Sequence, residues 1–112
     1  MSYKRSKYFN TGKNKIKYFL LKKNSKIAIV FFHGFMSDMV GEKPKTIQKF
    51  CVKQKINFLK FEYFGHGKSD GKFTEGNISK WTRDAKQLIK AKIKKNINLI
   101  FVGSSMGSWI AL

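Results

Sequence analysis

A chain of 112 residues with 42% hydrophobic and 15% aromatic residues is long enough to bury a core as a single domain, and this composition excludes a disordered protein. The formal net charge of +18 comes from lysines spread along the sequence, with arginine only at Arg5 and Arg83. Because arginine is the residue suited to bidentate phosphate recognition, we expect no nucleic-acid partner. No apolar run approaches the roughly 20 residues that cross a bilayer, so we expect no membrane span.

The first half of the chain predicts a hairpin, a strand and a helix. Two apolar and aromatic runs, 6–9 and 15–21, flank turn residues and are typical of an opening β-hairpin. The continuous apolar run 27–32 predicts a strand buried on both faces, followed by a polar loop over 33–38. An amphipathic helix is expected from near Pro44 to about residue 54, with Cys51 on its buried face.

The second half predicts two more strands with a helix between them. Residues 56–63 form the next expected strand, and the loop that follows, 64–71, is dense in turn residues. We expect Ser79 to cap a helix that runs to about Lys95. Its apolar face contains Trp81, Ala85, Leu88, Ile89 and Ile93. The apolar run 98–102 is the last expected strand.

The order of these elements is a hairpin followed by β-α-β-α-β-α, which predicts an α/β fold with a parallel sheet. Ligands of such sheets bind beyond the carboxyl ends of the strands. The loops 33–38, 64–71 and 103–107 all follow strands there. We therefore expect a site at this edge.

The apolar run 98–102 leads directly into Gly103-x-Ser105-x-Gly107 and a helix-like segment. This order of strand, sharp turn and helix is the context in which G-x-S-x-G forms a nucleophile elbow. Ser105 is then the expected nucleophile, and the Met106 amide at the helix start is an expected oxyanion donor. The alternative is a glycine-rich turn without chemistry.

A serine nucleophile also needs a second oxyanion donor, a base and an acid. The loop after the first parallel strand offers the Phe35 backbone N–H, with Gly34 allowing a close approach. His33 and His66 are the only histidines, and both precede the elbow in turns where a structural role is expected. Neither an acidic residue nor a histidine follows Ser105. We therefore expect residues 1–112 to be the N-terminal portion of a longer hydrolase domain, with the C-terminal strands and helices absent.

These motifs resemble the α/β-hydrolase superfamily, and within it the mitochondrial acyl-protein (palmitoyl-protein) thioesterase group and its bacterial relatives. The matching segments are 32–39, 61–71, Trp81 with Asp84, and 102–109. The resemblance implies Ser105 as nucleophile and the Phe35 and Met106 amides as the oxyanion hole. It also implies hydrolysis of a small-molecule or acyl-protein ester or thioester through an acyl-serine, without metal or cofactor.

Three functions remain open from the sequence. The first is a serine hydrolase of which this chain is one part, and the second is a catalytically inactive remnant that retains binding at most. The third is a basic module for nucleic acid or an anionic membrane. With Cys51 as the only cysteine, a reducing compartment is expected, and the cytoplasm is the first choice. The absence of acidic residues from 1–15 is a feature of mitochondrial transit sequences, but the hairpin pattern of this segment indicates folded structure, and mitochondria are the second choice.

Overall fold

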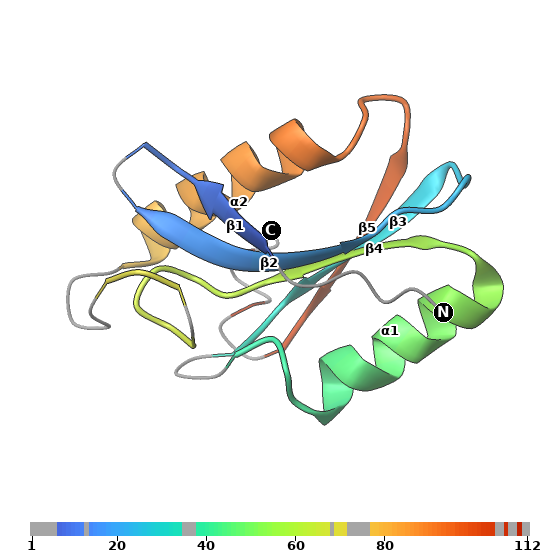
Figure 1. Ribbon diagram of the computed structural model, residues 1–112, viewed down its shortest axis with the longest axis horizontal. Coiled ribbons are helices and arrows are strands. Elements are labelled where there is room, and N and C mark those ends of the chain that lie inside the picture. The colour runs from blue at the N-terminus through green and yellow to red at the C-terminus, as the bar shows by residue number, and fades with distance from the viewer. Residues whose placement is uncertain are drawn as a thin grey trace.

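A computed structural model describes residues 7–12, 14–34, 38–67, 69–71, 77–104, 107 and 110. These residues form a mixed sheet that carries one long helix on each face (Figure 1). The elements in chain order are β1 (Lys7–Asn10), β2 (Lys15–Leu21), β3 (Ile27–Phe32), α1 (Glu42–Gln54), β4 (Asn57–Phe61), α2 (Ile78–Lys92) and β5 (Asn98–Gly103).

The sheet has the strand order β1-β2-β4-β3-β5. β1 and β2 form the expected antiparallel hairpin, and β2 joins the rest of the sheet by pairing antiparallel with β4. β3 lies between β4 and β5 and is parallel to both. The prediction of an opening hairpin followed by a parallel β-α-β-α-β arrangement is confirmed.

The continuous apolar run of β3 is explained by burial on both faces of the sheet. Ala28, Val30 and Phe32 face the cluster packed against α2, whereas Ile29 and Phe31 face the cluster packed against α1. In Figure 1, α2 and α1 lie on opposite sides of the sheet. A central parallel strand has no solvent face, so apolar residues stand at every position.

Helix α1 has the amphipathic character that the sequence predicts. Cys51 is fully buried in the cluster on this face of the sheet, as expected, and burial raises the pKa of its thiol to about 11. The helix ends where Lys55 adopts a left-handed conformation with φ of 58° and its N–H bonds back to the last turn. The thiol is therefore a neutral core group at physiological pH.

The bounds of α2 differ from the expected ones at both ends. Asn77, rather than Ser79, is the N-cap, because its backbone is extended and its side-chain Oδ1 accepts the Lys80 N–H at 2.8 Å. Ser79 is already helical. At the other end the helix stops at Lys92 instead of Lys95, since Ile93 takes an extended conformation and packs in the core.

Strand β5 is the edge strand of the described sheet, and its side chains are poorly covered. Leu99, Ile100 and Phe101 are 40%, 48% and 43% exposed, although Phe101 touches the Phe32 ring edge-on with centroids 5.2 Å apart. Consecutive residues of a strand point to opposite faces. Both faces of β5 are therefore open in this part of the molecule.

Candidate active site

The carboxyl ends of β3, β4 and β5 meet at one edge of the sheet, because the three strands are parallel. The loops that begin at His33, Glu62 and Ser104 all start from this edge. This is the edge at which α/β sheets bind ligands. Three loops that are far apart in sequence thus come together where the sequence predicts a site.

The turn after β5 is tight and leads into a helical segment. The Ser104 N–H donates to the Phe32 carbonyl oxygen at 3.1 Å, and the Gly107 N–H donates to the Ser104 carbonyl at 2.9 Å. Gly107 and Ile110 are helical and buried. A Cβ atom on Gly107 would overlap the Phe32 carbonyl group, so the close packing of turn and strand requires glycine here. The predicted nucleophile Ser105 and the Met106 amide lie outside the described residues.

The loop after β3 carries the second expected oxyanion donor, Phe35, which also lies outside the described residues. His33, at the start of this loop, is fully buried. Its Nε2 accepts the Tyr63 backbone N–H at 3.2 Å, so its Nδ1 carries the proton and donates to the Gly34 carbonyl at 2.7 Å. Both ring nitrogens are therefore engaged in holding the loop.

The pKa of His33 is lowered to about 4, mainly by burial. A group that is neutral at pH 7 with both nitrogens engaged is poorly suited to accept a proton from a nucleophile. These contacts support the expected structural role of His33.

Glu62 and Tyr63 hold the loop after β3 at both of its ends, a role that sequence reasoning missed. The Tyr63 hydroxyl donates to the His33 carbonyl oxygen at 2.9 Å. The buried Glu62 carboxylate accepts the Met39 N–H at 3.4 Å. The sequence does carry a signal for this role, because Glu62 directly follows the apolar strand β4. A carboxyl group at such a buried position needs hydrogen-bond partners.

The loop after β4 is packed around His66 and Trp81. The His66 ring is buried, and its centroid lies 5.0 Å from that of His33 and 5.0 Å from that of Trp81. The Trp81 Nε1–H donates to the Phe64 carbonyl oxygen at 2.9 Å, so α2 anchors the loop. Burial lowers the pKa of His66, and its Nδ1 lies 3.2 Å from the same carbonyl. A structural role is again favoured.

Strand β2 supports the far end of this loop. The Lys15 N–H donates to the Asp70 carboxylate at 2.8 Å, and the Asp70 N–H donates to the Lys15 carbonyl oxygen at 2.8 Å. The Lys17 N–H donates to the Ser69 hydroxyl, which in turn donates to the Glu62 carbonyl oxygen. The opening hairpin is thereby connected to the candidate site.

A small apolar hollow of about 300 Å³ lies beside the turn after β5, between this strand and α1. Gly103, Ser104 and Val102 line one side of it. At its rim the Lys43 ammonium donates to the Ser104 hydroxyl at 3.2 Å. In the described part of the chain, no group of three or more His, Cys, Asp or Glu side chains is placed to hold a metal ion. None of the described helices is long and apolar enough to cross a membrane.

Comparison with known proteins identifies the fold and the family. The sequence model of the α/β-hydrolase family described as serine aminopeptidase, S33, matches residues 23–112. The chain belongs to the serine aminopeptidase S33 family. In this S33 family member, β5, the helical residues Gly107 and Ile110 and the loops after β3 and β4 all lie within the matched region.

Curated and solved relatives agree with this assignment. The S33 family chain is 35% identical over 85 residues to rat (Rattus norvegicus) mitochondrial palmitoyl-protein thioesterase ABHD10. It superposes on mouse α/β hydrolase domain-containing protein 10 with a TM-score of 0.88 at 29% identity, covering 96% of this chain and 42% of that one. A putative hydrolase from Agrobacterium vitis gives a TM-score of 0.84, also at 29% identity, with the same coverage.

The relatives are longer than the chain. The match covers 76% of this chain but 28% of the rat protein. The predicted α/β-hydrolase class, its resemblance to the palmitoyl-protein thioesterase group and a hydrolase assignment at the family level are confirmed.

Proposed function

We propose that this chain contributes the nucleophile and the oxyanion hole of a serine hydrolase that cleaves carboxylic esters or thioesters through an acyl-serine. Ser105 attacks the carbonyl carbon, and the Phe35 and Met106 amides stabilise the oxyanion. The observation that carries this proposal is the tight turn between β5 and the helical residues Gly107 and Ile110, in which a Cβ on Gly107 would meet the Phe32 carbonyl group. A turn of this kind is needed to present a nucleophile above a sheet.

We further propose that the catalytic acid and histidine belong to sequence beyond residue 112, so that 1–112 is the N-terminal portion of one hydrolase domain. The open faces of β5 support this, because exposed Leu99, Ile100 and Phe101 offer a surface for further strands and helices. The structural roles of His33 and His66 support it as well. The relatives' length is consistent with a larger domain.

Labelling with a fluorophosphonate probe tests the nucleophile. We expect a protein that extends beyond Leu112 to react rapidly at Ser105 and the 112-residue chain to react far more slowly. Losing its base costs a serine protease about 10⁶ in kcat. Ser105→Ala should abolish labelling, while Ser104→Ala is the matched control that keeps it. Equal loss in both variants, or an extended protein that does not react, would contradict the proposal and favour an inactive remnant.

The substrate class is tested by comparing kcat/KM for a p-nitrophenyl ester and an S-palmitoyl peptide. The name of the rat relative gives a palmitoyl-protein thioesterase, and on this basis we propose that an acyl thioester is the better substrate. A higher kcat/KM for the oxygen ester would assign the protein to the esterases instead.

The compartment is a separate proposal. We propose the cytoplasm as first choice, because the sequence has one cysteine, Cys51, which is buried and free, and mitochondria as the alternative suggested by the name of the rat relative. Fractionation of cells that express the tagged protein separates the two.

A further inference from the structure

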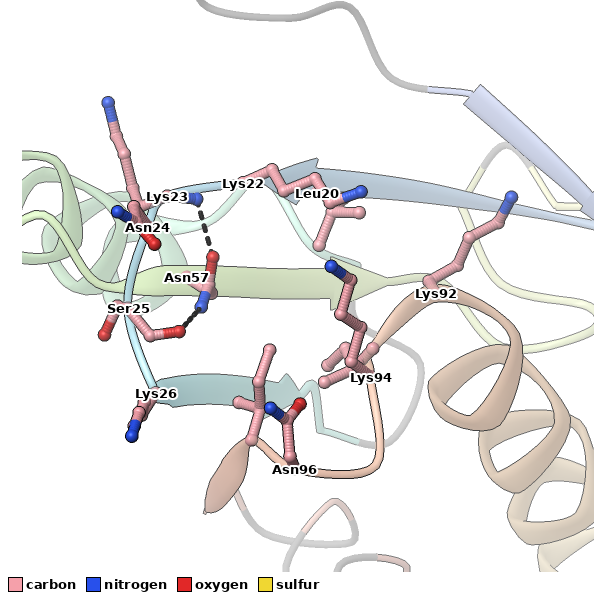
Figure 2. Close-up of a pocket in the computed structure, with 12 residues that line it drawn as sticks. Leu20, Lys22, Lys23, Asn24, Ser25, Lys26, Asn57, Lys92, Lys94 and Asn96 are labelled. Atoms are coloured by element: carbon pink, nitrogen blue, oxygen red, sulfur yellow. Dashed lines mark hydrogen bonds between the residues drawn. The ribbon is translucent and has the colours of Figure 1, made fainter.

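A second pocket, of about 320 Å³, opens at the edge of the sheet opposite the candidate active site (Figure 2). It is lined by the turn between β2 and β3, the first residue of β4 and the segment that joins α2 to β5. The six-residue strand β3 separates the two edges, a distance of roughly 20 Å at the rise of a strand. The volume lies near the lower end of the range for small-molecule sites, about 300–1,000 Å³.

The lining of this pocket is strongly basic. It includes Lys22, Lys23, Lys26, Lys92 and Lys94 and contains no acidic residue. The ion pair between Lys80 and Asp84 lies in the first turns of α2, at the end of the helix opposite Lys92. The ammonium groups around the pocket thus repel one another without a carboxylate to compensate them.

The pocket is also held in place by hydrogen bonds. Asn57 is buried at its base, where its Oδ1 accepts the Lys23 N–H at 2.6 Å. Its Nδ2 donates to the carbonyl oxygens of Ser25 and Ile27 at 3.0 Å each. One side chain therefore fixes the turn that carries three of the lysines, which reduces the ordering cost of binding a ligand.

The lysines differ in direction. Figure 2 shows Lys94 extending across the pocket toward Leu20, with the Lys22 ammonium group nearby, whereas the Lys92 ammonium lies apart from these two and those of Lys23 and Lys26 point away. The Lys92 ammonium lies 5.9 Å from the centroid of the Phe9 ring and 5.4 Å from that of the Tyr18 ring, two residues of the opening hairpin that do not line the pocket. The ammonium groups of Lys22 and Lys94 therefore lie over the pocket, and that of Lys92 lies at its margin toward the opening hairpin.

We propose that this pocket binds a small anion that carries two or more phosphate groups. Lysine binds phosphate as a point charge, and a pocket lined by five lysines, two of which place their ammonium groups over it, matches an oligophosphate better than a single carboxylate or phosphate. The apolar floor of Leu20, Ile93 and Ile97 excludes water from one side and strengthens these interactions. A concave site suits a compact anion rather than an extended nucleic-acid strand.

Calorimetric titration of the full chain with inorganic tripolyphosphate tests the proposal. At physiological ionic strength we expect one ligand per chain. The triple variant Lys22→Gln, Lys92→Gln and Lys94→Gln should weaken binding about thirtyfold, since each charge contact contributes a modest amount. Orthophosphate should bind about tenfold more weakly than tripolyphosphate. A nucleoside triphosphate that binds as well as tripolyphosphate supports a nucleotide ligand, and one that binds less well supports a bare oligophosphate.

The matched control removes the same charge from the opposite face. Lys45, Lys49 and Lys53 are exposed on α1, and their replacement by glutamine should change tripolyphosphate affinity less than about threefold, through long-range charge only. Equal losses of tripolyphosphate affinity in the two triple variants would overturn the proposal, because binding would then result from diffuse attraction by the net charge. Several ligands per chain, or tighter binding of a single-stranded oligonucleotide that ignores the pocket lysines, would overturn it as well. Thermal melting verifies that both variants are folded.

Discussion

Gly107 is the position at which the smallest change should have the largest effect on the candidate site. Its missing side chain allows the helical turn to approach the Phe32 carbonyl group. We expect Gly107→Ala to lower the free energy of unfolding by about 2–4 kcal/mol, since the overlapping atoms belong to backbone that cannot rotate away. Urea unfolding measures the change.

Gly41 is the control for this substitution. A Cβ atom there would meet nothing within 4 Å, and its φ of −71° suits any residue. Gly41 is the N-cap of α1, where alanine is a poorer cap than glycine but loses less conformational entropy on folding, so Gly41→Ala should change the free energy of unfolding by less than about 1 kcal/mol. Similar losses in the two variants would show that close packing at residue 107 is not the cause.

His33 makes stability depend on pH. Its pKa is about 4 in the folded chain, because of burial, and near 6.5 when unfolded. Between these values the unfolded chain binds a proton that the folded chain excludes, so stability is full above about pH 7 and falls as the pH drops toward 4. We expect this group to remove about 2 kcal/mol at pH 5 relative to pH 8. Urea unfolding at the two pH values measures the loss.

His33→Gln isolates this effect from other titrating groups. The variant loses stability at pH 8 because the contacts with Tyr63 and Gly34 are disturbed, but it should depend less steeply on pH. His66, whose pKa burial also lowers, contributes in the same direction in both proteins. Identical pH slopes for the variant and the original chain would contradict the assignment.

At the scale of elements, the N-terminus of α2 depends on one side chain. Asn77 accepts the Lys80 N–H, and α2 carries Trp81, which anchors the loop after β4. Asn77→Ala should cost about 1 kcal/mol in the free energy of unfolding, and Asn77→Asp should restore most of it. Ser79→Ala, a change within the first turn, should have little effect. A larger loss of stability for Ser79→Ala than for Asn77→Ala would make Ser79 the cap, as the sequence predicted.

At the scale of the whole molecule, the open strand β5 should make the 112-residue chain self-associate. Leu99, Ile100 and Phe101 are exposed beside an edge without a partner strand in the described sheet, which is an arrangement prone to pairing between copies. We expect sedimentation velocity to show concentration-dependent association at a salt concentration that screens the +18 charge.

Ile100→Lys should reduce this association. Val40, which is 60% exposed in a loop, is the matched control, because Val40→Lys removes a similar apolar side chain away from the edge. A protein that extends beyond Leu112 should stay monomeric if further strands cover β5. If Ile100→Lys and Val40→Lys reduce the association equally, the exposed edge strand β5 is not its cause.

The sequence predicted the order of strands and helices well, because the continuous run of β3 and the spacing of α1 and α2 each have one simple structural solution. It also predicted that the loops after β3, β4 and β5 meet at one edge of the sheet, since parallel strands share their carboxyl ends. It did not predict that β2 pairs with β4, or that Glu62 and Tyr63 hold the loop after β3. The contacts of Glu62 and Tyr63 join residues 23 and 30 positions apart, and the β2–β4 pairs are farther apart still. Local patterns carry no information on such pairs. The roles of Ser105, Phe35 and Met106 stay predictions.

The bonds from Lys15 and Lys17 to Ser69 and Asp70 have a consequence for anyone who shortens the protein. The opening hairpin looks dispensable, since it precedes the part of the chain matched by the family. Yet its second strand is hydrogen-bonded to a loop more than fifty positions later, and that loop begins at Glu62, at the edge of the sheet that carries the candidate active site. Removing β1 and β2 to improve expression would therefore take away the support of the loop after β4, even though Ser105, Phe35 and Met106 would all remain in the chain.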